Sequence, residues 1–122
     1  MTEHEHAKAL MEWCEYNYAQ FPELKLMFAI PNGGARHIAV ASKMKAEGVK
    51  AGVPDYFLPV ATRTYHGLFI ELKTEKGKAT KLQKEWHFDL ECEGYRVEVC
   101  NGWFAASDLL KSYMRSAKEK LL

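Results

Sequence analysis

The sequence has few of the features that would place it in a specialised class of protein. It contains only three cysteines in 122 residues, an odd number with no C-x-x-C pair, which argues against a disulfide framework and for a reducing compartment. The first residues, MTEHEHAKAL, lack the basic and apolar regions of a signal peptide. No apolar run approaches the roughly 20 residues that a transmembrane helix requires. We therefore expect a cytoplasmic protein.

The sequence also lacks an excess of either charge. Its 17 lysines and arginines balance 16 acids to a net charge of +1, which neither indicates nor excludes a nucleic-acid partner. The five histidines and the cysteines show no zinc-like spacing. Neither an internal repeat nor a linker interrupts the chain, and its length suits a single core. We expect one domain over residues 1–122.

Hydrophobic periodicity predicts alternating helices and strands. In chain order we expect a helix at 3–18, a strand at 26–30, a helix at 36–47, strands at 56–60 and 68–73, a helix at 80–93, a strand at 95–100 and a helix at 107–121. The polar connection between the second and third strands favours an antiparallel hairpin, whereas the helix between the third and fourth strands favours a parallel crossover. The predicted fold class is therefore α/β, with a mixed sheet between helices.

Three charges gather at one end of the predicted hairpin. Asp55 begins one strand, and Glu71 and Lys73 end the next. Side chains alternate along a strand, so Glu71 and Lys73 share a face. If the connecting loop is centred near residue 64, Asp55 lies opposite about Leu72. The spacing thus predicts a cluster of Asp55, Glu71 and Lys73 at one edge of the sheet.

Such a cluster suits metal-assisted chemistry. Two neighbouring carboxylates repel each other when ionised unless a cation compensates. Mg²⁺ is commonly held by one or two carboxylates and keeps waters for a phosphate-bearing substrate, and such an ion can activate a bound water. Lys73 would orient the nucleophile or stabilise developing charge. The simpler interpretation is a solvated salt-bridge group, and the spacing alone leaves both open.

The surrounding sequence resembles a known nuclease signature. Pro54-Asp55…Glu71-Leu72-Lys73 has the form PD-(D/E)xK of the restriction-endonuclease-like nucleases. Within that superfamily the chain looks like the virus-type replication-repair nuclease (VRR-Nuc) family, especially its compact stand-alone members in phages and prophages. The segments that carry the resemblance are AIPNGGAR, KAEGVKAGVPD, GLFIELK, KLQKEW and GYRVEVC. The resemblance implies an αβββαβ core with an extra helix after the first strand, which agrees with the predicted element order.

The resemblance also implies roles for the clustered residues. Asp55 and Glu71 would be ligands of Mg²⁺ or Mn²⁺, together with the backbone carbonyl of Leu72. Lys73 would be the catalytic lysine.

Two further residues would complete the site by resemblance. Gln83 would be an accessory active-site residue, although Thr80 and Gln83 also fit a T-x-x-Q capping box, and the two roles are compatible. The family carries a glutamate in its N-terminal helix. We choose Glu3, because it lies four residues before Ala7 on the apolar stripe of that helix, whereas the other acids of the helix point away or lie on its flank.

Several residues are candidates for contact with DNA. They are Asn32, Gly33, Gly34, Arg36, Lys76 and Lys78. The first four could present backbone N–H groups and an arginine to a phosphate, but they also suit a tight turn. The two lysines lie in the loop before the third helix and could bind phosphates, or simply be solvated.

Two classes of function follow from these expectations. The resemblance implies a metal-dependent, structure-specific DNA endonuclease that acts on branched DNA as a homodimeric Holliday-junction resolvase in a bacterial or phage setting. The alternative enzyme is a nuclease directed at flaps or nicks. The other class is a non-catalytic DNA-binding module with the same fold. The presence of Asp55, Glu71 and Lys73 together favours the enzyme.

Overall fold

The computed structural model describes residues 1–32 and 38–119 of the chain. Its elements, in chain order, are α1 (Glu3–Tyr16), a 3₁₀ turn η1 (Pro22–Leu26), β1 (Phe28–Ala29), α2 (Ile38–Ala46), β2 (Tyr56–Leu58), β3 (Leu68–Lys73), α3 (Lys81–Cys92), β4 (Arg96–Asn101) and α4 (Trp103–Glu119). The order agrees with the prediction, although β1 is much shorter than expected. Among the described helices, none is long and apolar enough to cross a bilayer.

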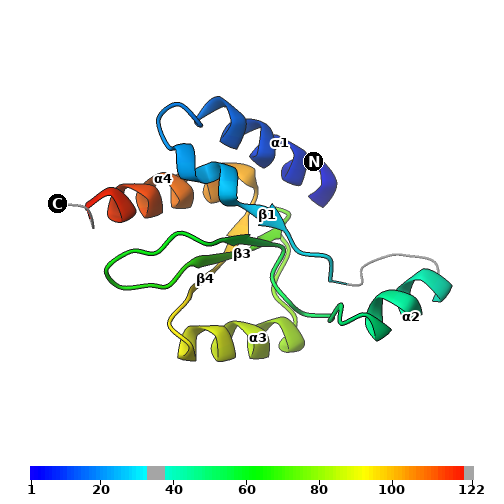
Figure 1. The fold of residues 1–122 in the computed structure, drawn as a ribbon. Helices are drawn as coiled ribbons and strands as arrows, with labels where there is room; N and C mark the ends of the chain where they lie inside the picture. Colours follow the sequence, from blue (N-terminus) through cyan, green and yellow to red (C-terminus); the bar gives the residue numbers. More distant parts are fainter. Residues whose placement is uncertain (33–37, 120–122) are drawn as a thin grey trace.

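The four strands form one mixed sheet in the order β1-β2-β3-β4. The pairs β1–β2 and β2–β3 are antiparallel, and β3–β4 is parallel, as the sequence predicts. Helices α1 and α4 lie on one side of the sheet and α3 lies on the other (Figure 1). The α/β fold class is therefore confirmed.

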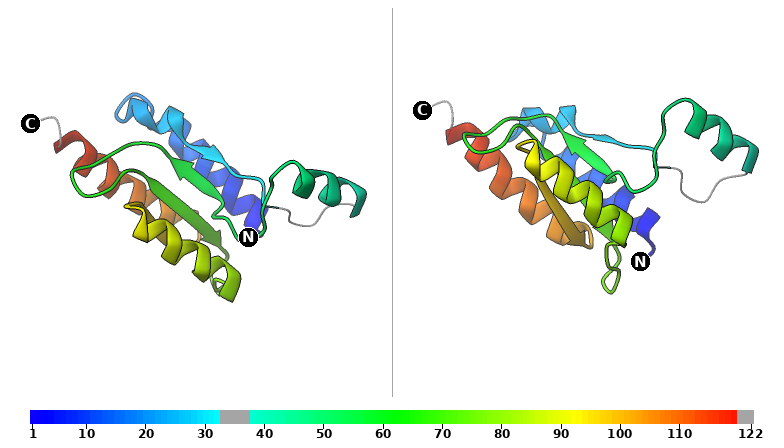
Figure 2. Two further views of the ribbon diagram at one scale, coloured as in Figure 1. Left: turned by 60° about the horizontal axis from the view of Figure 1, so that its bottom comes forward. Right: turned by 90° about the horizontal axis from the view of Figure 1, so that it is seen from below.

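The extra helix α2 stands apart from this sandwich. It follows β1 and projects beyond the end of the sheet in both further views (Figure 2). None of its described side chains is fully buried. Gly48 follows it with a φ of +103°, in the left-handed region that glycine adopts readily after a helix.

The core fills the space between the sheet and the pair α1 and α4. Ile70 and Leu72 of β3 are buried there against Leu10 of α1 and Leu110 of α4. The hydroxyl of Tyr113 donates to the Val60 carbonyl over 2.6 Å and ties α4 to the hairpin. Because Ile70 and Leu72 point into this core, the alternate residues Glu71 and Lys73 point to the opposite face.

The register of the hairpin differs from the prediction by one residue. Tyr56 pairs with Ile70, and continuing that register places Asp55 opposite Glu71 rather than Leu72. The rings of Phe57 and Phe69 stack on the same face, with centroids 4.3 Å apart. The true register therefore brings the two carboxyl groups closer together than the predicted one does.

Candidate active site and metal centre

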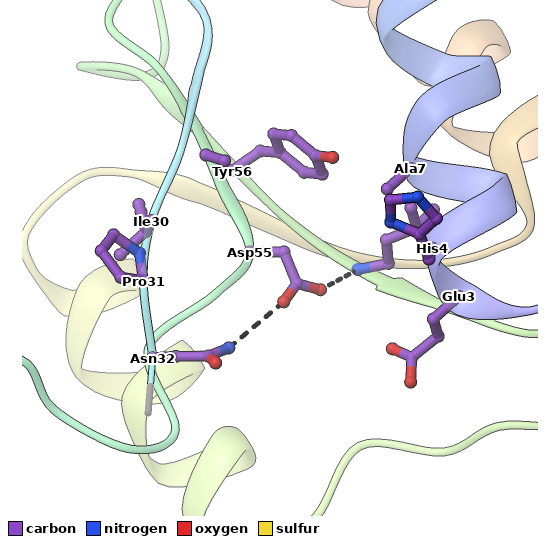
Figure 3. A pocket seen from close by; sticks show the side chains of 10 residues that line it. Glu3, His4, Ala7, Ile30, Pro31, Asn32, Asp55 and Tyr56 are labelled. Carbon is purple, nitrogen blue, oxygen red and sulfur yellow. Dashed lines mark hydrogen bonds between the residues drawn. The ribbon is translucent and has the colours of Figure 1, made fainter. Parts of the chain in front are cut away.

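Asp55 is fixed in place by hydrogen bonds from two neighbouring segments. Its Oδ2 accepts the Leu72 N–H over 2.7 Å, and its Oδ1 accepts the side-chain amide of Asn32 over 3.3 Å (Figure 3). Its own carbonyl accepts the Ile30 N–H over 2.8 Å. Asp55 thus sits where β1, β2 and β3 meet, with a set orientation before any ligand arrives.

Glu71 is a buried acid with an unpaired oxygen. Its side chain is 1% exposed, and Lys73 Nζ lies 3.9 Å from its Oε2. Its Oε1 has no hydrogen-bond partner among residues 1–32 and 38–119. Burial, and secondly the neighbouring Asp55, raise the pKa of Glu71 to about 9, against a smaller opposing effect of Lys73. At neutral pH the free protein therefore holds Glu71 as a neutral acid.

This arrangement fits a divalent cation with oxygen ligands. A buried carboxyl group beside a second carboxylate is costly to ionise, and a cation removes that cost. In the part of the chain that the structure describes, no three His, Cys, Asp or Glu side chains form a metal-binding group. The protein side chains alone would leave a cation with few ligands. That suits Mg²⁺, which keeps several waters when bound by one or two carboxylates.

A cavity of about 720 Å³ opens beside Asp55. Its lining comes from the start of α1, the segment after β1 and the hairpin: Glu3, His4, Ala7, Ala29, Ile30, Pro31, Asn32, Asp55, Tyr56 and Leu72. Figure 3 shows Glu3 and His4 of α1 across this space from Asp55 and Asn32. The cavity gives a substrate access to Asp55, whereas the side chain of Glu71 is buried behind its lining.

Glu3 lies at the site, but not as the sequence predicts. Its side chain is exposed, and the buried positions of α1 are His6, Leu10 and Cys14. The expectation that Glu3 belongs to the buried stripe is therefore wrong, because the first turn of α1 extends to the solvent-open rim of the cavity. Its negative charge nevertheless contributes to the raised pKa of Glu71.

His6 is a buried residue near the start of α1, and its ring contacts two other segments close to the site. Its Nδ1 accepts the Trp103 N–H over 3.0 Å. That backbone group can only donate, so the ring proton is on Nε2, which lies 3.0 Å from Glu75 Oε1. His6 thus joins α1, the start of α4 and the loop after β3. Sequence reasoning missed this role.

The loop after β3 carries two of the candidate DNA contacts. Lys76 and Lys78 are exposed there. Asn101 donates to the Thr74 carbonyl over 2.8 Å and to the Gly77 carbonyl over 2.7 Å. The loop is therefore held from β4 as well as from His6, and it presents its lysines from a fixed backbone.

The remaining candidate DNA contacts lie around the segment after β1. Gly33, Gly34 and Arg36 lie outside the described residues. Asn32 is described, and its side chain is bound to Asp55. The structure thus gives Asn32 a contact within the site that the sequence did not indicate.

Gln83 closes the N-terminus of α3. Thr80 Oγ1 accepts the Gln83 N–H over 3.2 Å, and Gln83 Oε1 accepts the Thr80 N–H over 2.9 Å. The capping box is therefore confirmed. Gln83 is not among the residues that line the cavity.

His87 is a residue of the site that sequence reasoning missed. It is buried on α3, and its Nε2 lies 3.6 Å from Glu71 Oε1. Burial lowers the pKa of His87 and so favours the uncharged ring. A signal was present: His87 follows Gln83 by four residues, so both occupy the same face of α3.

The fold and the cluster of site residues together define a class of protein. A mixed sheet in αβββαβ order places Asp55, Glu71 and Lys73 together at the end of an antiparallel hairpin. This is the core of a restriction-endonuclease-like protein, and the class is a nuclease-type domain.

Comparisons with known proteins identify the family within this class. The family model described as the VRR-NUC domain matches residues 1–104, and the chain belongs to that family. It is similar to a solved structure titled "VRR_NUC domain protein", with 32% sequence identity and a TM-score of 0.80, over 95% of this chain and 90% of that one. Among curated proteins no match was found.

Proposed function

We propose that this protein is a divalent-metal-dependent DNA endonuclease. The observation that carries the proposal is that the buried carboxyl group of Glu71 lies beside the oriented carboxylate of Asp55. A structural salt bridge would not need a second acid at this position. Lys73 lies on the same face, where it can contact a phosphate bound at the pair.

The residues present fit Mg²⁺ or Mn²⁺. Asp55, Glu71 and the Leu72 carbonyl would hold the ion, and Glu3 at the rim of the cavity would be a further ligand. When bound, such an ion polarises a phosphodiester and lowers the pKa of a bound water. Lys73 would stabilise the charge that develops on the phosphate, and Asp55 is already oriented by Leu72 and Asn32.

We further propose branched DNA as the substrate and a homodimer as the acting species, as the family resemblance implies. Two sites in a dimer suit the two symmetric strands of a four-way junction. Lys76 and Lys78, with Asn32 and the adjoining Gly33, Gly34 and Arg36, would contact the DNA backbone. These contacts position the substrate and carry no sequence preference of their own.

A comparison of substrates and metals tests the function. The purified protein is incubated with a labelled four-way junction, a flap and a linear duplex, each with Mg²⁺, with Mn²⁺ or with EDTA. We expect cleavage only with metal, and fastest on the junction. Preferred cleavage of the flap would show that the substrate is a flap rather than a four-way junction. Binding without cleavage in every condition would favour a non-catalytic DNA-binding module.

Replacement of Gln83 by glutamate separates its two roles. A glutamate preserves the T-x-x-E capping box, so stability should change little, whereas alanine removes it at a cost of about 1 kcal/mol. If Gln83 also serves the site, both variants should lose cleavage by about 10-fold or more. Parallel measurement of urea unfolding and junction cleavage decides this. Full activity of Gln83→Glu would restrict Gln83 to capping.

A further inference from the structure

Two buried polar atoms face each other between β3 and α3. Glu71 Oε1 and His87 Nε2 are 3.6 Å apart, with side chains only 1% and 10% exposed. Neither atom has a hydrogen-bond partner within the described ranges. Their separation is too long for a hydrogen bond. It is also too short for a bridging water, which needs about 5 Å between its two partners.

The simplest way to satisfy both atoms is therefore a hydrogen bond between them. A buried donor or acceptor that stays unpaired carries its full desolvation penalty. A small rotation of the His87 ring would shorten the separation to hydrogen-bond length and satisfy both atoms. An aliphatic side chain would fill the same position on α3 without creating an unpaired nitrogen, so packing alone does not account for a histidine there.

We infer that His87 is a positioning residue, which binds Glu71 Oε1 and holds the carboxyl group in the orientation that a metal ion requires. Lys73 lies beside the other oxygen, Oε2, at 3.9 Å. His87 thus engages one oxygen and leaves Oε2 as the oxygen available to a cation. The role of His87 toward the metal rests on the proposed function, whereas its pairing with Glu71 does not.

The pairing is tested in the absence of metal by a double-mutant cycle. Urea midpoints are measured in EDTA for wild type, His87→Leu, Glu71→Leu and the double variant. His87→Leu should lower the midpoint of the wild-type protein, because Glu71 loses its partner. In the Glu71→Leu background it should leave the midpoint unchanged or raise it, because no buried acid remains. Equal shifts in the two backgrounds, of either sign, would overturn the pairing.

The effect on metal binding is tested by calorimetric titration with Mn²⁺ alone. His87→Leu should weaken Mn²⁺ binding by about 10- to 100-fold, as loss of an outer partner of a metal ligand typically does. His87→Gln, whose amide can replace the ring nitrogen, should recover most of the affinity. Phe88→Leu on the exposed face of α3 is the matched control and should bind as wild type does.

The outcomes separate the inference from the proposed function. Unchanged affinity in His87→Leu, or equal losses in the leucine and glutamine variants, would overturn the positioning role. If wild type itself binds no Mn²⁺, the metal-dependent function fails, and with it the positioning of a metal ligand. The metal-free cycle would then still decide whether His87 and Glu71 are paired.

Discussion

Replacement of Lys73 by alanine, or of Asp55 by asparagine, is expected to lower the rate of junction cleavage by about 10²- to 10⁴-fold. Lys73 supplies a positive charge 3.9 Å from the buried acid. Asp55 supplies a carboxylate already oriented by Leu72 and Asn32. The asparagine variant keeps the shape of the side chain and loses the negative charge. The rate is measured under single-turnover conditions with Mg²⁺, and again with Mn²⁺.

Matched substitutions on α3 show whether the losses are specific. Lys84→Ala and Asp89→Asn make the same chemical changes at exposed positions that do not line the cavity. Both should cleave at the wild-type rate. Circular dichroism and urea unfolding confirm that each variant is folded. Wild-type activity in a folded Lys73→Ala or Asp55→Asn variant would contradict the proposed mechanism.

Glu71→Gln is expected to stabilise the metal-free protein at alkaline pH while it abolishes cleavage. Burial, followed by Asp55, raises the pKa of Glu71 from 4.5 to about 9 in the folded protein. Between these values the unfolded chain releases a proton that the folded chain retains. This contribution to stability is therefore complete below about pH 4.5 and is lost progressively as the pH rises toward 9. Glutamine carries no titratable proton, so the Glu71→Gln variant does not lose this stability as the pH rises.

Urea unfolding in EDTA at several pH values measures the difference. Relative to acidic pH, we expect the free energy of unfolding of wild type to fall behind that of Glu71→Gln by on the order of 5 kcal/mol at pH 8, and the gap to shrink as the pH is lowered. Glu85→Gln, an exposed acid on α3, is the control and should follow wild type. Parallel pH profiles of wild type and Glu71→Gln would show that Glu71 ionises normally in the folded state.

The strands of the site were predictable because the hairpin has a strong pattern. Leu68–Lys73 was predicted with the bounds that the structure shows. The register was not, since it depends on how the connection at 59–67 folds and on the stacking of Phe57 on Phe69. Even so, Asp55, Glu71 and Lys73 come together as predicted, because an error of one residue moves the partner of Asp55 by only one position along β3.

Apolar spacing alone does not identify the buried residue of α3. A search for apolar periodicity selects Leu82, Trp86 and Leu90, but Leu82 is 46% exposed. The buried residue of α3 is His87. Apolar spacing finds the faces that pack against hydrophobic core, and it overlooks polar side chains that face a functional site.

The beginning of α4 also depends on contacts that lie far apart in the sequence. The helix begins at Trp103, four residues before the predicted start. Gly102 precedes it with a φ of +99°, and the Trp103 N–H is accepted by His6 of α1. The bond joins residues 97 positions apart. A local sequence pattern could therefore not reveal this hydrogen bond or the start of α4 that depends on it.

The proposed function requires that Asp55 and Glu71 together hold a divalent metal ion. The most direct measurement is a crystal structure of the protein soaked with Mn²⁺, with an anomalous difference map calculated at the manganese edge. We expect a peak within coordination distance of the Asp55 and Glu71 carboxyl groups and the Leu72 carbonyl. Saturating Mn²⁺ with no peak at these two acids, or with a peak only elsewhere on the protein, would contradict it.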